Sequence, residues 1–273
     1  MTRIAKTFED LRTSGRRGFI PFVSAGDPDL ETSREIVIAL ARNGANIIEL
    51  GVPFTDPMAD GPTIQASSQR ALENGVTVTD ILQMVRDLRR EVETPIVLFS
   101  YLNPLFRYGF EKLAADAADA GVDGVLVTDA VDEVAFVAST ILQSRGLDLI
   151  SLIAPTTSDE RLERIAVNAS GFIYAVSRAG VTGTQSETAS AAEELVKRAR
   201  KFTDLPIAVG FGISTRKQIE EVWRYADAAV VGSAIVKEIE RSIPNGNTIE
   251  RVFEFVHELL PPVANTETEN LES

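Results

Sequence analysis

The stretch DGVLVTDAVDEVAFVASTILQSRGLDLISLI, residues 123–153, contains the unit that decides the fold. An apolar run at 123–129 is followed by a helical pattern at 132–146 and by a second apolar run at 147–153. Both runs are apolar almost throughout, which is typical of parallel strands that are covered on both faces. Gly146 is the usual type of residue just past a helix C-terminus. The stretch therefore predicts two parallel strands joined by a helix.

The same unit recurs along the whole chain. Runs of the strand type lie at 18–24, 45–51, 95–101, 123–129, 147–153, 171–177, 206–212 and 227–233. Helical patterns lie between several of them, at 29–44, 78–92, 110–121, 132–146 and 188–202. Eight strand–helix units predict a single (β/α)₈ barrel, and an open doubly wound sheet is the alternative because its local alternation is the same.

The two ends of the chain differ from this repeat. The pattern at 2–12 predicts an extra helix before the first strand, at the bottom of the barrel. Residues 261–273 contain too few large apolar groups to pack, which predicts a disordered tail. We therefore expect one barrel domain over residues 1–260.

Composition restricts the class of protein. A chain of 273 residues, 44% of them hydrophobic, can bury one large core. The chain has no cysteine and only one histidine, His257, so we expect no metal site. It has no apolar run of membrane-spanning length, and its charged N-terminus is unlike a secretory signal, which favours a cytoplasmic protein. The net charge of −13 opposes binding to nucleic acid or to anionic membranes.

Two carboxylates follow the second predicted strand, in IIELGVPFTDPMADGPTIQ at 47–65. Functional groups of such barrels come from the loops at the carboxyl ends of the strands. An inward-pointing Glu49 would be desolvated by its apolar neighbours, and the raised pKa would let it give and take protons near neutral pH. Asp60 is on a longer loop, where we expect more hydration. The pair suits one acid and one base.

A simpler interpretation exists for the aspartates. Asp60 precedes Gly61 and Pro62 and could cap a helix that starts there, and Asp56 before Pro57 favours a turn even more. For Glu49 this interpretation is weaker, because a buried carboxylate needs a partner and no nearby basic residue offers one.

Glycines follow the last two predicted strands, in GFGIS at 210–214 and GSAIVK at 232–237. The backbone N–H groups of Gly212, Gly232 and Ser233 could converge on an anion at a helix N-terminus, which is the frequent phosphate position of barrels. A single glycine pair would indicate only a tight turn, but two pairs at adjacent strand ends favour a phosphate site.

The segment SRAGVTGTQSETAS, 177–190, is small and polar and follows the sixth predicted strand. This composition is typical of a loop that closes over a substrate, although an ordinary flexible connection is the alternative. Gly183 could add a phosphate contact, and the Thr182 hydroxyl could reach a carboxylate across the barrel mouth.

The chain resembles a known family through a series of motifs. These motifs are GFIPFVSAGDP, IIELGVPFTDPMADGPTIQ, YLNP, YAVSRAGVTG, VGFGIS and VGSAIVK. In the same order and at comparable spacing they resemble those of the tryptophan synthase alpha subunit, over essentially the whole chain except the tail. The resemblance implies a phosphate-binding barrel that cleaves indole-3-glycerol phosphate to indole and glyceraldehyde 3-phosphate without a cofactor.

The resemblance also implies roles for individual residues. Glu49 would be the general acid and base, Asp60 would stabilise positive charge at the indole nitrogen, and Tyr174 would participate in the active site. Thr182 would orient Asp60. The walls of the indole pocket would be Phe22, Ile64, Phe99, Tyr101, Leu126 and Phe211. The phosphate would be held by Gly183, Gly212, Gly232 and Ser233.

A protein partner is implied in the same way. Members of the family associate with a pyridoxal-phosphate-dependent beta subunit, typically as an α₂β₂ heterotetramer, and Asp56 and Pro57 would face that partner. Two positions after Asp129, Val131 stands where the family usually carries a proline. This departure concerns the contact between the subunits and leaves the catalytic set intact.

Two other functions remain open from the sequence. One is a phosphosugar isomerase, or an indole-releasing lyase that needs no beta subunit, on the same barrel. The other is a regulatory subunit that binds a phosphosugar, whose activity would be insensitive to Glu49→Gln. The presence of both Glu49 and Asp60 in the matching motif favours the lyase.

Overall fold

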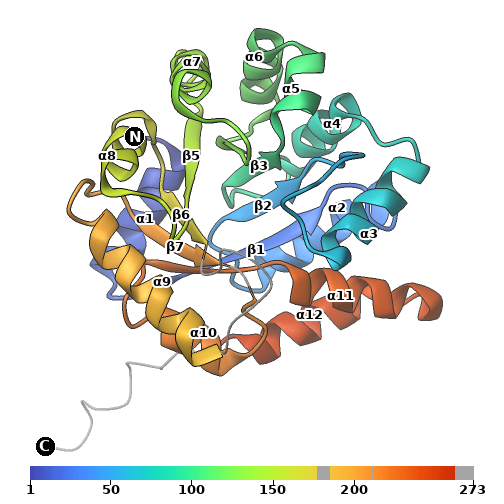
Figure 1. The fold of residues 1–273 in the computed structure, drawn as a ribbon. Coiled ribbons are helices and arrows are strands. Elements are labelled where there is room, and N and C mark those ends of the chain that lie inside the picture. The colour runs from blue at the N-terminus through green and yellow to red at the C-terminus, as the bar shows by residue number, and fades with distance from the viewer. Residues whose placement is uncertain (177–184, 211, 262–273) are drawn as a thin grey trace, which may run out of the picture.

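The strands form a closed parallel barrel. The computed structural model describes residues 1–176, 185–210 and 212–261. Each strand pairs in parallel with the next along the chain, and β1 pairs with β8, which closes the sheet (Figure 1). The predicted (β/α)₈ barrel is therefore confirmed, and the open sheet is excluded. The strands are β1 Gly18–Ser24, β2 Ile48–Gly51, β3 Ile96–Ser100, β4 Gly124–Val127, β5 Asp148–Ile153, β6 Ile173–Val176, β7 Ile207–Gly210 and β8 Ala228–Val231.

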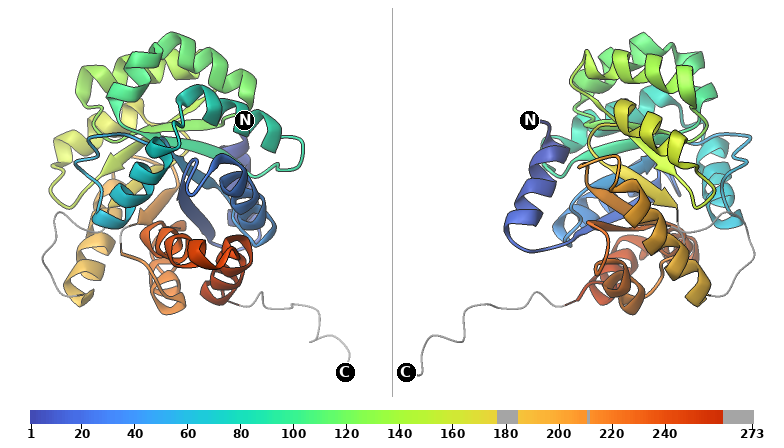
Figure 2. Two further views of the ribbon diagram at one scale, coloured as in Figure 1. Left: turned by 90° about the vertical axis from the view of Figure 1, so that its right-hand side faces the viewer. Right: turned by 60° about the vertical axis from the view of Figure 1, so that its left-hand side comes forward.

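Helices surround this barrel on its outer side (Figure 2). Several begin at the side-chain caps that favour helix starts: Asp29 caps α2, and Thr77 forms a capping box at α4. The helices are α1 Arg3–Thr13, α2 Leu30–Arg42, α3 Pro62–Glu73, α4 Val78–Leu88, α5 Leu102–Tyr108, α6 Phe110–Ala120, α7 Asp132–Gln143, α8 Asp159–Asn168, α9 Gln185–Ala199, α10 Arg216–Val222, α11 Ser233–Ser242 and α12 Thr248–Leu259. The segment Ile243–Asn245 is a short 3₁₀ helix.

The core has two layers because strand side chains alternate between the two faces of the sheet. Ile48 and Leu50 of β2 are fully buried and pack on the outer side of the barrel, against the helices. Ile47, directly before β2, packs inside the barrel. Glu49, between Ile48 and Leu50, shares the inward face with Ile47. The alternation thus places one carboxylate inside an apolar barrel.

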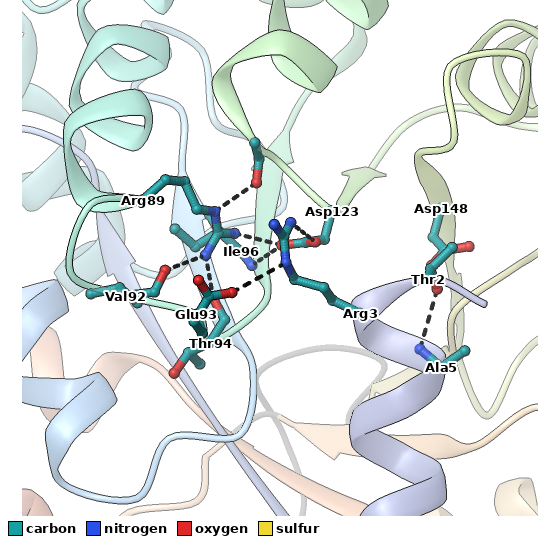
Figure 3. Close-up of polar contacts among 11 residues, drawn as sticks. Thr2, Arg3, Ala5, Arg89, Val92, Glu93, Thr94, Ile96, Asp123 and Asp148 are labelled. Atoms are coloured by element: carbon teal, nitrogen blue, oxygen red, sulfur yellow. Dashed lines mark hydrogen bonds and ion pairs between the residues drawn. The ribbon is translucent and has the colours of Figure 1, made fainter.

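The extra helix predicted before the first strand is present as α1, and it covers the amino-terminal ends of the strands. Its apolar residues Ile4, Phe8 and Leu11 are buried among the side chains of the barrel interior. Polar contacts tie its start to β4 and β5: Arg3 Nη1 lies 3.0 Å from Asp123 Oδ1, and the Thr2 hydroxyl donates to Asp148 Oδ2 at 2.7 Å (Figure 3). The barrel is thus closed at this end, which leaves its interior accessible from the carboxyl ends of the strands.

Candidate active site

A cavity of about 100 Å³ opens at the carboxyl ends of the strands. Most of the residues that the sequence predicts for the site meet in its wall, although they come from distant parts of the chain. The lining residues are Phe22, Glu49, Asp60, Gly61, Ile64, Phe99, Tyr174, Gly212, Val230, Gly232 and Ser233.

Glu49 is fully buried in the wall of this cavity. It pairs in register with Phe22 of β1 and with Val97 of β3, so apolar residues flank it on both sides. Neither carboxylate oxygen has a hydrogen-bond partner among the described residues. Burial therefore raises the pKa of Glu49 well above its usual value, as the sequence predicts. The neutral acid is favoured, and the group can both donate and accept a proton.

Asp60 lies in the loop between β2 and α3 and is half-buried. Burial raises its pKa to about 6, and the nearby Tyr101 hydroxyl partly offsets this rise. Asp60 is more exposed to water than Glu49, as the sequence predicts. Loop and strand residues nevertheless cover much of the Asp60 carboxylate. Helix α3 is capped by Gly61 without any side-chain bond, so Asp60 is not its cap. At neutral pH Asp60 is therefore mostly ionised, and its charge faces the cavity.

Tyr174 of β6 is buried next to both carboxylates. Its pKa is raised well above the usual value by burial and by the charges of Glu49 and Asp60. Its ring meets that of Phe99 edge-on at 6.3 Å, and Phe99 in turn meets Phe22 at 5.3 Å. These rings form one continuous apolar surface beside the acids, which suits a flat aromatic ligand.

Glycines of the last two strand ends also contribute to the wall of the cavity. Gly212 has a φ of +75°, a left-handed conformation that favours glycine. Gly232 is the N-cap of α11, and Ser233 is its first residue. A helix N-terminus presents unpaired N–H groups and the positive end of the helix dipole. The cavity therefore combines acidic and aromatic side chains with backbone groups of the kind that can bind an anion.

Some predicted residues lie elsewhere. Leu126 is fully buried in the barrel interior and does not line the cavity, because its position on β4 places it within the inner packing layer. Tyr101 lines a smaller neighbouring pocket with Asp60. Thr182, Gly183 and Phe211 lie outside the described residues.

The sequence reasoning missed two lining residues, Gly61 and Val230. Val230 is on β8, two residues before Gly232, which directly follows the strand. Because strand side chains alternate between the two faces, this spacing could have identified Val230 as a lining residue. Gly61 could have been found as the residue between Asp60 and the helix that starts at Pro62. Within the described residues, no group of three or more histidine, cysteine, aspartate or glutamate side chains is arranged to hold a metal ion. The same residues contain no helix long and apolar enough to span a bilayer.

The closed barrel, with two carboxylates in a cavity at the carboxyl ends of its strands, defines the class of the protein as a (β/α)₈-barrel enzyme. Residues 8–261 match the family model of the tryptophan synthase alpha chain. The chain belongs to this family.

Individual relatives agree with the family model. The chain is 51% identical to a tryptophan synthase alpha chain of Acidiphilium cryptum, over 88% of this chain and 87% of that protein. It is 46% identical to one of Roseiflexus, over 95% and 99% of the two chains. The solved tryptophan synthase alpha subunit of Legionella pneumophila superposes with a TM-score of 0.88 at 34% identity, over 95% and 97% of the two chains. The predicted function, a lyase that cleaves indole-3-glycerol phosphate in tryptophan biosynthesis, is confirmed at the level of the family.

Proposed function

We propose that Glu49 and Asp60 divide the chemistry of indole-3-glycerol phosphate cleavage between them. The retro-aldol reaction requires a proton at C3 of the indole ring, removal of a proton from the glycerol hydroxyl next to the breaking bond, and stabilisation of positive charge at the ring nitrogen. Glu49 delivers the first proton and takes up the second. Asp60 accepts the indole N–H and stabilises the cationic tautomer.

The observation that carries this proposal is the contrast between the two carboxylates. Both line one cavity, yet Glu49 is fully buried on a strand and its carboxylate has no partner among the described residues, whereas Asp60 is half-buried on a loop. A neutral acid beside an ionised carboxylate supplies both the proton and the negative charge that the reaction needs. The order of the site also fits the substrate, because the aromatic side receives the indole ring and the N–H groups of Gly212, Gly232 and Ser233 receive the phosphate. Tyr174 packs beside both acids and keeps water away from Glu49.

The test is indole release from indole-3-glycerol phosphate by the purified chain and by Glu49→Gln and Asp60→Asn. Removing a general acid or a charge-stabilising group typically costs a factor of about 10² to 10⁴ in rate. Both variants should lose activity to this extent while they still bind inorganic phosphate. Full activity in either variant would contradict the proposed role of that residue, and absence of indole from the unmodified chain would contradict the function.

The proposal includes a partner, the pyridoxal-phosphate-dependent beta subunit, in an α₂β₂ assembly. Large apolar side chains are exposed on the segments that follow three consecutive strands: Met58 after β2, Phe106 after β3 and Phe136 after β4, with exposed fractions of 93%, 73% and 60%. Asp56 and Pro57 lie on the first of these segments. Val131 is itself exposed, at the N-cap of α7. Exposed apolar groups of this size are typical of a protein interface.

Calorimetric titration with a beta subunit tests this surface. Met58→Gln should weaken binding about tenfold or more, since a buried apolar anchor at an interface typically contributes more than 1 kcal/mol. Phe253→Gln is the control, because Phe253 is 42% exposed but lies on α12, away from these three segments. Equal affinities of Met58→Gln and the unmodified chain would exclude Met58 from the interface.

A further inference from the structure

A second cavity lies on the outer side of the barrel, between α7 and α8, which pack against β5 (Figure 1). Its volume is about 460 Å³, and residues of β4 and β5 form part of its wall. Pockets of about 300–1,000 Å³ are the size that small-molecule ligands occupy. None of the residues that line the active-site cavity lines this one. The cavity is therefore a separate candidate binding site.

Strand β5 is incompletely covered at this place. Leu149 and Ile153 belong to the outer layer of the core, so Ser151 between them also faces the helices. Leu149 and Ile153 are buried, whereas Ser151 is half-buried and lines the cavity. Strands of parallel sheets are usually covered on both faces. The gap between α7 and α8 thus leaves a place where a bound group would complete the packing.

The interior of the gap is largely apolar. Val127, Ala135, Leu149 and Ile165 all line it, and they come from four different elements, β4, α7, β5 and α8. Val127 and Leu149 are buried, and Ala135 and Ile165 are half-buried. An apolar group of a ligand placed among these side chains would be removed from water, which is favourable.

Charged side chains of both signs lie at the opening of the cavity. Arg161 and Arg164 are exposed lining residues one turn apart on α8. Asp132 and Glu133 are exposed lining residues in the first turn of α7. Arg164 Nη2 lies 3.6 Å from Asp132 Oδ1, which is too long for a hydrogen bond, and Arg161 forms no ion pair within the described residues. Both arginines therefore retain hydrogen-bond donors for a ligand.

This arrangement of charges favours a ligand that carries both signs. A simple anion would be attracted by the arginines and repelled by the two acids, and a simple cation would meet the reverse. In a free α-amino acid, the carboxylate can face the arginines while the ammonium group faces the acids. Its side chain would then occupy the apolar interior.

We infer that the cavity between α7 and α8 binds a free α-amino acid with a large apolar side chain. Arg161 and Arg164 hold its carboxylate, and Asp132 and Glu133 hold its ammonium group. This inference goes beyond the proposed function, because the cavity shares no lining residue with the active site.

The test is calorimetric titration of the purified chain with L-tryptophan, tryptamine and indole-3-propionate. The two analogues keep the indole ring, but tryptamine lacks the carboxylate and indole-3-propionate lacks the ammonium group. A hydrogen bond to a charged group contributes about tenfold or more in affinity, so each analogue should bind at least about tenfold more weakly than L-tryptophan. Val131 and Phe136 border both this cavity and the surface proposed for the beta subunit, so the titrations use the chain without a partner.

Two substitutions in the wall of the cavity make the test specific. Arg164→Gln should weaken the binding of L-tryptophan about tenfold or more and leave kcat/KM for indole release unchanged. Ala135→Leu, which narrows the apolar interior, should also weaken this binding. Arg90→Gln is the matched control, because Arg90 is an exposed arginine just after α4 with an ion pair of similar length, 3.5 Å to Asp87 Oδ1. The control should bind L-tryptophan as the unmodified chain does.

Four results would each overturn the inference. They are no binding of L-tryptophan, equal affinity for L-tryptophan and either analogue, equal affinity of Arg164→Gln and the unmodified chain, and competition with the substrate. Competition would appear as a KM for indole-3-glycerol phosphate that rises in proportion to L-tryptophan at constant kcat, and it would place L-tryptophan in the active site. If the unmodified chain releases no indole, the proposed function fails, whereas the titrations still test this cavity.

Discussion

Replacing Glu49 by glutamine should make the free energy of unfolding less dependent on pH. Burial raises the folded-state pKa of Glu49 above the value of 4.5 that is usual for glutamate. Below this pKa of the unfolded chain, the carboxyl is protonated in both the folded and the unfolded chain. It then makes no pH-dependent contribution to the free energy of unfolding. As the pH rises above this pKa, the unfolded chain loses this proton while the folded chain keeps it, so stability is lost until the pH reaches the folded-state pKa. Glutamine has a similar shape and does not titrate.

The slope can be worked out from proton binding alone. One extra proton held by the folded state corresponds to about 1.4 kcal/mol per pH unit, or about 2.7 kcal/mol over two units inside this window. Such a difference is a substantial fraction of total stabilities of about 5–15 kcal/mol. Relative to Glu49→Gln, the unmodified chain should therefore lose stability as the pH rises above 4.5.

Urea unfolding at a series of pH values from 4 to 8 measures this difference. All other titrating groups are shared by the two chains and cancel in the comparison. Glu220→Gln, an exposed change on α10, is the control and should run parallel to the unmodified chain. If the curves of Glu49→Gln and the unmodified chain are parallel across this range, the desolvation of Glu49 is refuted, whatever the activity of the variant.

Two further substitutions test the packing that supports the site. Gly210→Ala would place a methyl group 2.1 Å from the Tyr174 hydroxyl oxygen. This overlap should destabilise the folded chain by about 1–3 kcal/mol, which lowers the midpoint of thermal unfolding. An unchanged midpoint would contradict the close approach of Gly210 and Tyr174. Arg70→Met would leave Asp27, whose side chain is fully buried, without the two hydrogen bonds at 2.7 and 2.9 Å that it accepts from Arg70. We expect urea unfolding to show a loss of about 3–5 kcal/mol in the free energy of unfolding. The exposed control Arg12→Met should lose less than about 1 kcal/mol, and equal losses in the two variants would contradict a stabilising role of the buried pair.

The strands could be predicted because each is buried on both faces, so its composition alone distinguishes it from the helices. Closure of the barrel could not, because the pairing of β1 with β8 joins segments more than 200 positions apart, and an open sheet has the same local pattern. The burial of Glu49 followed from its position between Ile48 and Leu50, which alternation places on the opposite face.

The surroundings of Asp60 were harder to predict. Its pKa depends in part on Tyr101, which lies 41 positions later and reaches the loop only once β2 and β3 have paired. For the same reason, the sequence identified Tyr101 as an aromatic side chain near the site but not its hydrogen bond with the Ala59 N–H. The depth of Leu126 within the barrel also depends on packing that no local pattern records.

The contacts of α1 have a consequence for the synthesis of the chain on the ribosome. This helix is made before its partners Asp123 and Asp148, which are 120 and 146 residues away from the residues they bind. Until β4 and β5 have left the ribosome, the stripe of Ile4, Phe8 and Leu11 lacks part of the apolar surface that covers it, including Leu126 and Ile150. At about 5–20 residues per second, this delay lasts several seconds or more. During that interval the nascent chain exposes part of the apolar face of α1, which is the kind of surface that molecular chaperones bind.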